Sequence, residues 1–483
     1  MGACSRLSAA LSCRSHATAG DHRGADASLG GGTWESGKTE KEVIALVGKV
    51  VANRVMELTR PGDAVLYSPA RVTTATMCAP WPSICRGARS VCSAHRPGQD
   101  APKTTLDLDP APALVVDGLF GIGLNRPLDA DWMQVIAQVN AKQLLVLSVD
   151  VPSGVDATTG ESGRGDSSQG NADTRRGQVG SLAKCLRVRR PLRVAPDIGL
   201  VPYRETSDLL LGQAKDFNRF PPARPLGGHK GTFGHLGIVA GSMGYHGAAV
   251  LAARGACRAQ PGLITLMTPL MVLGLVASQL QSVMVRPLVP GEITFKSITG
   301  LLIGPGLADK DLPEDLKETT RKMWVESSVP IVVDASALDW LPSGAFLDKA
   351  IRVITPHPGE AARLLNSTVD KVQADRVEAL RTLSAKFGGC WVVLKGQHTL
   401  IGRNEGEVFI NPTGNPGLGQ GGSGDLLAGY LAGLLVQPLL REDVGQTIRY
   451  AVWQHGAAAD ELAAQAPNWV VEDLAKRIGA VQA

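Results

Sequence analysis

Residues 415–425 read Asn415-Pro416-Gly417-Leu418-Gly419-Gln420-Gly421-Gly422-Ser423-Gly424-Asp425. Glycines let consecutive backbone N–H groups turn toward one point, and the apolar, small-residue pattern over 423–435 predicts a helix directly after them. The positive N-terminal end of that helix would complete an anion cradle. A carboxylate there would repel bound phosphate, so we interpret Asp425 as a general base that accepts a proton from a substrate hydroxyl. The alternative is a glycine-rich turn in which Asp425 is only a helix-start charge.

The residues around this loop alternate between strand and helix patterns. Strands are predicted at 236–240, 262–266, 300–303, 331–334, 353–355 and 391–394, and a further helix at 248–258. Glycine-bearing turns follow several of these strands, at 241–244, 304–306, 356–360 and 395–399. We therefore predict a doubly wound, mostly parallel α/β domain whose ligands bind beyond the carboxyl ends of the strands.

Two of these turns carry side chains suited to chemistry. Pro356-His357-Pro358-Gly359-Glu360 places a histidine and a carboxylate at a strand end, although a proline-stiffened turn with Glu360 as a helix-start charge explains it equally well. Lys395-Gly396-Gln397-His398-Thr399 offers a lysine and backbone N–H groups suited to phosphate or ribose, and its alternative is a simple β-turn.

The N-terminal half shows a second, weaker α/β pattern. Strands at 64–67, 113–117 and 144–150, with a helix at 132–139, predict a parallel βαβ arrangement. Residues 1–38 read as a disordered leader before a helix that begins near Thr39, and 203–228 as a linker. Periodicity is absent from 68–100 and 160–193.

Bulk composition limits the classes of function. A chain of 483 residues predicts two domains, and the net charge of +4 with 4% aromatic residues favours neither a nucleic-acid nor a membrane partner. None of the eight cysteines forms a C-x-x-C pair and no apolar run is long enough to span a bilayer, so we predict a cytoplasmic protein in a reducing compartment. We also expect a homo-oligomer.

Residues 225–483 resemble the NAD(P)H-hydrate dehydratase family, a branch of the ribokinase-like superfamily. The resemblance runs through 229–235, 247–249, Gly304-Pro305-Gly306-Leu307, 355–360, Leu394-Lys395-Gly396 and 411–425. The chain departs from the family pattern at Gln281-Ser282, at Ala308 in place of glycine, and at Ser336 in Asp334-Ala335-Ser336-Ala337-Leu338, where the family has a second aspartate.

This resemblance implies a repair reaction on hydrated NADH or NADPH. A nucleoside phosphate, ADP or ATP with Mg²⁺, would phosphorylate the ring hydroxyl, and elimination would restore the double bond. Asp425 would be the base and Gly424 would hold the transferring phosphate. The nucleotide would be contacted by Lys395, Gly396, Gln397, His398 and Thr399, and the hydrate site would be lined by Ala248, Gly306, His357 and Asp425.

The N-terminal half resembles NAD(P)H-hydrate epimerase, a Rossmann-like αβα domain, over 115–127 and 147–156. The resemblance implies a potassium ion bound by Asp117 and Ser153. It also implies a hydrate site formed by Gly121, Ile122, Gly123, Leu124, Asn125, Arg126, Pro127 and Asp150. The alternative is that the two aspartates merely end their strands. We assign 39–215 to this domain and 225–483 to the dehydratase domain.

One family signature is missing from the epimerase-like half. Asn-Asn-Gly-Gly-Asp-Gly should follow the strand at 64–67, but the chain reads Ser68-Pro69-Ala70-Arg71-Val72. We hypothesise that 68–100 and 160–193 are altered-frame sequence between correctly read segments, because the pattern is lost and regained abruptly. Resequencing the coding region tests this. If the stretches are genuine, the epimerase-like half lacks its substrate and ion site.

Two other functions remain open at this point. A small-molecule kinase of the ribokinase superfamily would begin with the same phosphoryl chemistry but release a phosphorylated product. Residues 1–220 could instead form a non-catalytic binding or scaffolding domain.

Overall fold

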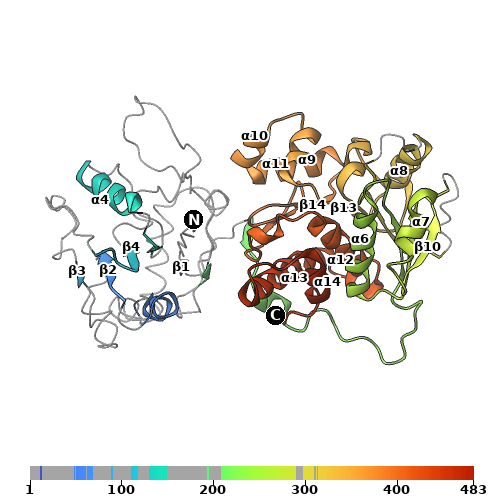
Figure 1. Ribbon diagram of the computed structural model, residues 1–483. Helices are drawn as coiled ribbons and strands as arrows, with labels where there is room; N and C mark the ends of the chain where they lie inside the picture. Colours follow the sequence, from blue (N-terminus) through green and yellow to red (C-terminus); the bar gives the residue numbers. More distant parts are fainter. Residues whose placement is uncertain are drawn as a thin grey trace, which may run out of the picture. The chain divides into compact units, whose positions relative to one another are not determined.

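The fold is seen in a computed structural model (Figure 1). The structure describes residues 11–12, 48, 51–60, 63–68, 89–90, 110–117, 130–142, 144–148, 193–194, 208–289, 297–308, 312 and 314–482. Only the backbone is described for 11–12, 67–68, 89–90, 140, 148 and 193–194. The chain divides into two compact units between Leu209 and Leu210, and each unit is described by itself.

The N-terminal unit contains the predicted parallel sheet. Its order is β3 (Arg89–Ser90), β2 (Val65–Ser68), β4 (Leu114–Asp117) and β5 (Val146–Ser148), all parallel, with helix α4 (Ala130–Ala141) between β4 and β5 in the chain. Two short strands, β1 (Leu11–Ser12) and β6 (Arg193–Val194), pair separately. One apolar cluster joins the helical residues 51–58 to the sheet, through Val51, Val55, Val65, Leu114, Val116 and Leu147. The strand–helix–strand prediction is confirmed.

The C-terminal unit is built on a sheet of ten strands. Their order is β10 (Met284–Pro287), β9 (Leu263–Thr268), β8 (His235–Val239), β11 (Gly300–Ile303), β12 (Ile331–Val333), β13 (Arg352–Ile354), β14 (Trp391–Leu394), β15 (Leu400–Gly402), β16 (Val408–Ile410) and β7 (Leu209–Leu211). Strands β10 to β14 are parallel, whereas β14, β15 and β16 pair antiparallel. Most of the parallel strands are almost wholly apolar because both faces of the sheet are buried.

Strand order reverses beside β8. From β8 the chain runs outward through β9 to β10, and it then returns to β11 on the other side of β8 and continues to β14. Such a switch point opens a crevice at the carboxyl ends of the two central strands. The doubly wound architecture predicted from the sequence is therefore confirmed.

Helices separate the strands along the chain. They are α6 (His246–Ala259), α7 (Leu270–Ala277), α8 (Glu314–Glu326), α9 (Pro358–Leu364), α10 (Val369–Ala374), α11 (Arg376–Lys386), α12 (Ser423–Leu435), α13 (Val444–Gln465) and α14 (Val471–Arg477). Short 3₁₀ turns form η1 (Ala214–Phe217), η2 (Ala335–Trp340), η3 (Pro416–Leu418) and η4 (Pro438–Arg441). The helix predicted at 423–435 has the predicted bounds. No described helix combines the length and the apolar character needed to cross a bilayer.

The linker predicted at 203–228 was wrong for part of its length. Strand β7 joins the ten-stranded sheet, and η1 places Phe217 in the core at 2% exposure. The Phe217 ring lies 5.5 Å from that of Tyr450 and 5.4 Å from that of Trp453, measured between centroids. Strand pairing and aromatic packing, of Phe217 and also of Phe220 against Tyr450, thus attach a segment whose sequence has no periodicity.

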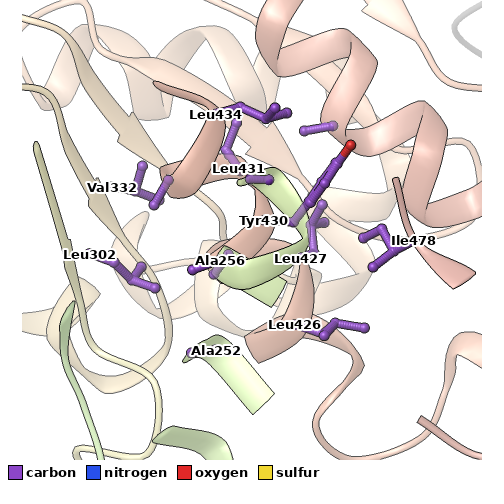
Figure 2. Packing of buried hydrophobic residues seen from close by; sticks show 14 of the residues in the cluster. Ala252, Ala256, Leu302, Val332, Leu426, Leu427, Tyr430, Leu431, Leu434 and Ile478 are labelled. Carbon is purple, nitrogen blue, oxygen red and sulfur yellow. The ribbon is translucent and has the colours of Figure 1, made fainter. Parts of the chain in front are cut away.

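Helices α6 and α12 pack almost backbone to backbone. Figure 2 shows Ala252 and Ala256 of α6 facing the leucines and Tyr430 of α12, with Leu302 and Val332 of the sheet beside them. Two glycines permit this approach. A Cβ atom at Gly429 would lie 1.9 Å from the Ala252 carbonyl oxygen, and one at Gly255 would lie 2.1 Å from that of Leu426. The start of α12 is therefore fixed relative to the crevice by main-chain contact.

We predict that Gly429→Ala lowers the free energy of unfolding of the C-terminal unit by about 1–3 kcal/mol, because the added methyl group forces the helices apart. Gly274→Ala in α7 is the matched control, since a Cβ atom there meets nothing within 4 Å. It should be neutral or stabilise by up to about 1 kcal/mol through helix propensity. Urea unfolding followed by tryptophan fluorescence measures both variants, and equal effects would contradict the packing argument.

Candidate active site

Two glycine turns meet at the switch point. The Gly241 N–H donates to the Pro305 carbonyl at 2.8 Å, and the Ser242 hydroxyl donates to the Gly306 carbonyl at 2.6 Å. Gly306 has φ +67, and a Cβ atom there would lie 2.9 Å from the Cβ atom of Ala248. The structure thus brings together Ala248 of α6 and Gly306 after β11, two of the four residues that the resemblance assigned to the hydrate site of the C-terminal half.

The glycine loop ends at the N-terminus of α12. Gly422 precedes the helix with φ +92, and its Cα faces Leu251 of α6, where an added Cβ atom would lie 2.3 Å from Cδ1. Asp425 lies in the first turn of the helix, as predicted. From α13, the buried His455 Nε2 lies 3.0 Å from the Ser423 carbonyl oxygen and 3.3 Å from its hydroxyl. The N-terminus of α12 is therefore held from two sides.

A charged cluster lies beside this helix start. The Lys395 Nζ lies 2.8 Å from Oδ1 of Asp334 and 4.0 Å from Oε2 of Glu360. Asp334 is 2% exposed, and its Oδ1 also accepts a hydrogen bond from the Thr355 hydroxyl at 2.7 Å. A Cβ atom at Gly424 would be 3.3 Å from the Lys395 Nζ, so this ammonium group lies against the loop.

Burial and the neighbouring acidic charges oppose each other on the pKa of Lys395 but act together on that of Asp425. Burial lowers the pKa of Lys395, but the negative charges of Asp334, Glu360 and Asp425 outweigh it and leave that pKa raised. Burial and the charges of Asp334 and Glu360 raise the pKa of Asp425, Lys395 opposes them, and the net result is a pKa of about 6. Asp425 is thus ionised at neutral pH while retaining the proton affinity that a general base needs.

The Pro356–Glu360 turn caps helix α9. The His357 Nδ1 accepts hydrogen bonds from Gly359 N at 3.0 Å and Glu360 N at 3.4 Å, and Glu360 Oε2 accepts one from His357 N at 2.8 Å. The turn therefore caps the start of α9, and the role of His357 in a hydrate site stays a prediction. The His357 side chain is 53% exposed, with Nε2 3.6 Å from Glu360 Oε1. Because Glu360 also faces Lys395, the capping turn forms part of the charged cluster.

Lys395–Thr399 connects β14 to the antiparallel β15. Lys395 N donates to the Pro356 carbonyl at 2.9 Å and the Thr399 hydroxyl donates to that of Gly396 at 3.0 Å. Gly396 has φ +137 and His398 φ +53, so two of these residues have left-handed backbone. The His398 side chain is buried. The turn predicted from the sequence is present, and it carries the lysine of the cluster.

The predicted sites of the N-terminal unit are described only at Asp117, which ends β4. Ser153, Asp150 and 121–127 lie outside the described residues. Within the described part of the chain, no three His, Cys, Asp or Glu side chains are grouped so as to hold a metal ion.

Sequence reasoning missed three contributors to this site. Asp334 follows a buried strand, and that position at a carboxyl end could have marked it as a partner of Lys395. His455 and Arg376 carry no such signal, because each contacts a segment that only the tertiary fold brings near: His455 lies at the start of α12, and Arg376 donates to the Gln397 and His398 carbonyls.

Fold and site together define a class of protein. The C-terminal unit is a doubly wound α/β enzyme domain with a glycine loop at a helix N-terminus, and it holds a buried carboxylate beside a lysine at the carboxyl ends of its strands.

Comparison with known proteins identifies the family. The NAD(P)H-hydrate dehydratase family matches residues 236–480, and the YjeF-related protein N-terminus family matches 63–166. The bifunctional NAD(P)H-hydrate repair enzyme Nnr of Moorella thermoacetica is 37% identical over 73% of this chain and 69% of its own. That of Escherichia coli is 32% identical over 73% and 68%. The chain belongs to the family of bifunctional NAD(P)H-hydrate repair enzymes.

Among solved structures, the ADP/ATP-dependent NAD(P)H-hydrate dehydratase of Bacillus subtilis, co-crystallised with ATP and Mg²⁺, is 28% identical. The match covers 56% of this chain and 96% of that protein, with a TM-score of 0.49.

We predict that Lys395→Met destabilises the C-terminal unit by about 3 kcal/mol, because it leaves the buried Asp334 carboxylate without its counter-charge. The matched control is Lys322→Met, which breaks an ion pair to Glu326 whose two side chains are 71% and 62% exposed. That change should cost less than about 1 kcal/mol. Urea unfolding at neutral pH compares the two variants, and a Lys395→Met effect no larger than the control contradicts the buried-pair assignment.

Proposed function

We propose that this chain uses ADP or ATP to dehydrate hydrated NADH and NADPH back to the reduced cofactors. The observation that carries the proposal is Asp425 itself. It is a partly buried carboxylate with a pKa of about 6, in the first turn of the helix that the glycine loop opens, beside Lys395. Family membership supplies the substrate class.

In the proposed reaction, the hydroxyl oxygen on the hydrated ring attacks the terminal phosphorus of the nucleotide, and Asp425 accepts the hydroxyl proton. The bond to the shortened nucleotide breaks, which leaves a phosphorylated ring. The ring carbon–oxygen bond then breaks to release phosphate, while the neighbouring carbon loses a proton and the double bond returns. Gly424 and its neighbours would hold the phosphoryl group with backbone N–H donors and the positive end of α12. Ala248, Gly306 and His357 would line the hydrate site.

Lys395 would act on the phosphates of the nucleotide. The Lys395 ammonium lies beside the Asp334 and Glu360 carboxylates. Its positive charge would offset part of the negative charge of these carboxylates and of the incoming nucleotide phosphates. Gly396, Gln397, His398 and Thr399 complete the proposed nucleotide contact, and the buried side chain of His398 limits that residue to a backbone contribution. Mg²⁺ would enter with the nucleotide and would neutralise part of the phosphate charge. Phosphate oxygens and water would hold it beside the carboxylates of Asp334 and Glu360.

For the N-terminal unit we propose an NAD(P)H-hydrate epimerase ancestry. Asp117 ends a parallel strand, the position at which such folds bind ligands, which supports its pairing with Ser153 around K⁺. Residues 121–127 and Asp150 would contact the hydrate. If 68–100 is genuine sequence, the missing signature predicts that this unit has no epimerase activity.

We also propose a cellular compartment and an oligomeric state for the enzyme. The free cysteines Cys257 and Cys390 support a reducing, cytoplasmic compartment. The apolar side chains of Leu270, Met271 and Leu275 on α7 are 72%, 74% and 52% exposed, which supports assembly into a homo-oligomer.

The central test follows recovery of reduced-nicotinamide absorbance after purified protein is added to epimeric NADH hydrate with ADP or ATP. We expect recovery only with nucleotide, and at least about a hundredfold loss of kcat in Asp425→Asn because the base is removed. Asp348→Asn, at an exposed carboxylate, is the control and should keep full activity.

Other outcomes of this assay are equally informative. Accumulation of a phosphorylated hydrate without absorbance recovery favours the kinase alternative, and no reaction with either nucleotide rejects the dehydratase. Recovery that stops when one epimer is spent, after subtraction of spontaneous epimerisation, shows that the N-terminal unit has no epimerase activity.

The pH dependence follows from the Asp425 pKa of about 6. A base works as the carboxylate, so kcat/KM should be level above that pKa and fall about tenfold per pH unit below it. Lys395→Met removes the charge that lowers the Asp425 pKa, so the midpoint should move upward. Initial rates between pH 5 and 8 measure both profiles, and a flat profile across pH 6 would argue against Asp425 as the base.

A stability control accompanies that profile. Burial lowers the pKa of His455 from 6.5 to about 4, so the unfolded state binds a proton that the folded state does not in this range. Folding stability should therefore decline as pH falls from about 6.5 toward 4. Tryptophan fluorescence at each pH separates this loss from titration of Asp425.

A further inference from the structure

The backbone of the Lys395–Thr399 turn converges on one buried guanidinium. Arg376, the first residue of α11, is 4% exposed. Its Nη1 donates to the carbonyls of Gln397 at 2.5 Å and His398 at 3.3 Å, and its Nη2 donates to those of Leu394 at 3.0 Å and Lys395 at 3.4 Å. Three of the four acceptors belong to the turn that links β14 to β15, and the fourth, Leu394, is the last residue of β14.

From this geometry we propose that Arg376 is a positioning residue for nucleotide binding, which sets the shape of the Lys395–Thr399 turn without touching substrate. The inference rests on the proposed function of that turn. It adds a residue from a different helix, one that no motif of the sequence singled out.

The turn has a shape that needs external support. Gly396 and the non-glycine His398 both have left-handed backbone, at φ +137 and +53. The guanidinium lies directly against the chain here, since a Cβ atom at Gly396 would be 3.3 Å from Arg376 Nη2. A planar fork with several fixed donors can hold such a turn, whereas a lysine ammonium provides a single centre.

The same contacts orient the peptide groups. In a trans peptide, the carbonyl and the following N–H point in opposite directions. Carbonyls of Lys395, Gln397 and His398 that turn toward Arg376 therefore direct the next N–H groups to the opposite side of the turn. N–H groups directed to one side are what phosphate-binding turns use.

The charge of Arg376 is not cancelled locally. Its four acceptors are backbone carbonyls, its Nε has no hydrogen-bond partner, and the described residues place no carboxylate within ion-pair distance of it. Burial lowers the pKa of Arg376 to about 10, which keeps the group charged at neutral pH. A net positive charge under the turn favours an anionic ligand.

The chain contains a matched control for this arrangement. Arg352 is 1% exposed and donates to the carbonyls of Trp324 at 2.6 Å, Val329 at 2.9 Å and Ile351 at 3.1 Å. It is the first residue of β13, so it lies at the amino end of a strand, whereas the proposed site lies at the carboxyl ends. Loss of this fork should affect stability alone.

The test compares Arg376→Lys with Arg352→Lys in the full chain, by calorimetric titration with ADP and Mg²⁺ and by thermal unfolding. We expect both variants to lower Tm. Only Arg376→Lys should raise the Kd for ADP, by about tenfold or more, which corresponds to about 1.4 kcal/mol. In the absorbance assay it should raise KM for ADP while changing kcat by less than about threefold, because no reacting group is lost.

Each outcome decides between the roles. An unchanged Kd in Arg376→Lys, or equal shifts in both variants, overturns the positioning role even if the wild-type enzyme is active. Absence of ADP and ATP binding in the wild type rejects the proposed nucleotide site and the inference with it. Binding without dehydratase activity rejects the proposed reaction but leaves the Arg376 comparison valid.

Discussion

Main-chain contact between α6 and α12 is the constraint on which the site depends. Glycines at 255 and 429 let the two helices approach until backbone atoms touch, and the leucines of α12 fill the space against the sheet. The position of Asp425 in the first turn of α12 is therefore set by the core. One turn before Ala252 along α6, Ala248 meets Gly306 at the switch point. The packing of α6 against α12 thus fixes the position of Asp425 relative to the two glycine turns at the switch point.

The charges around Asp425 then determine its proton affinity. The cluster contains three acidic side chains, of Asp334, Glu360 and Asp425, and one lysine, so it carries net negative charge before any phosphate arrives. That imbalance, together with burial, raises the Asp425 pKa, while Lys395 opposes the rise and the net pKa is about 6. A buried cluster of this kind stabilises the fold little and serves chemistry instead. The uncancelled charge of Arg376 contributes an opposite sign beneath the neighbouring turn.

The sequence predicted the parts of this unit that repeat a period or follow a buried strand. Strand 391–394 and helix 423–435 have the predicted bounds, because the strand is a continuous apolar run and the helix starts directly after the glycine loop and ends before Gln437-Pro438. Phe217 was assigned to a linker because a single aromatic residue has no period, and its burial depends on Tyr450 and Trp453 far along the chain. Arg376 was overlooked for the same reason: its four partners are backbone carbonyls, which no side-chain pattern encodes.

The departures from the family pattern fall at three places in the C-terminal unit. Ser336, which replaces an aspartate, lies in η2, whereas the retained Asp334 is the residue paired with Lys395. Ala308 replaces a glycine at an exposed position without left-handed backbone, so its methyl group causes no strain. Gln281 and Ser282 are exposed after α7. Every departure in the C-terminal unit thus falls outside the charged cluster, while the missing signature of the N-terminal unit removes polar and glycine residues at a strand end. Two causes would leave an intact cluster in the C-terminal unit and a missing signature in the N-terminal unit. One is selection for the dehydratase activity alone, and the other is a frame error in the coding sequence of the first half.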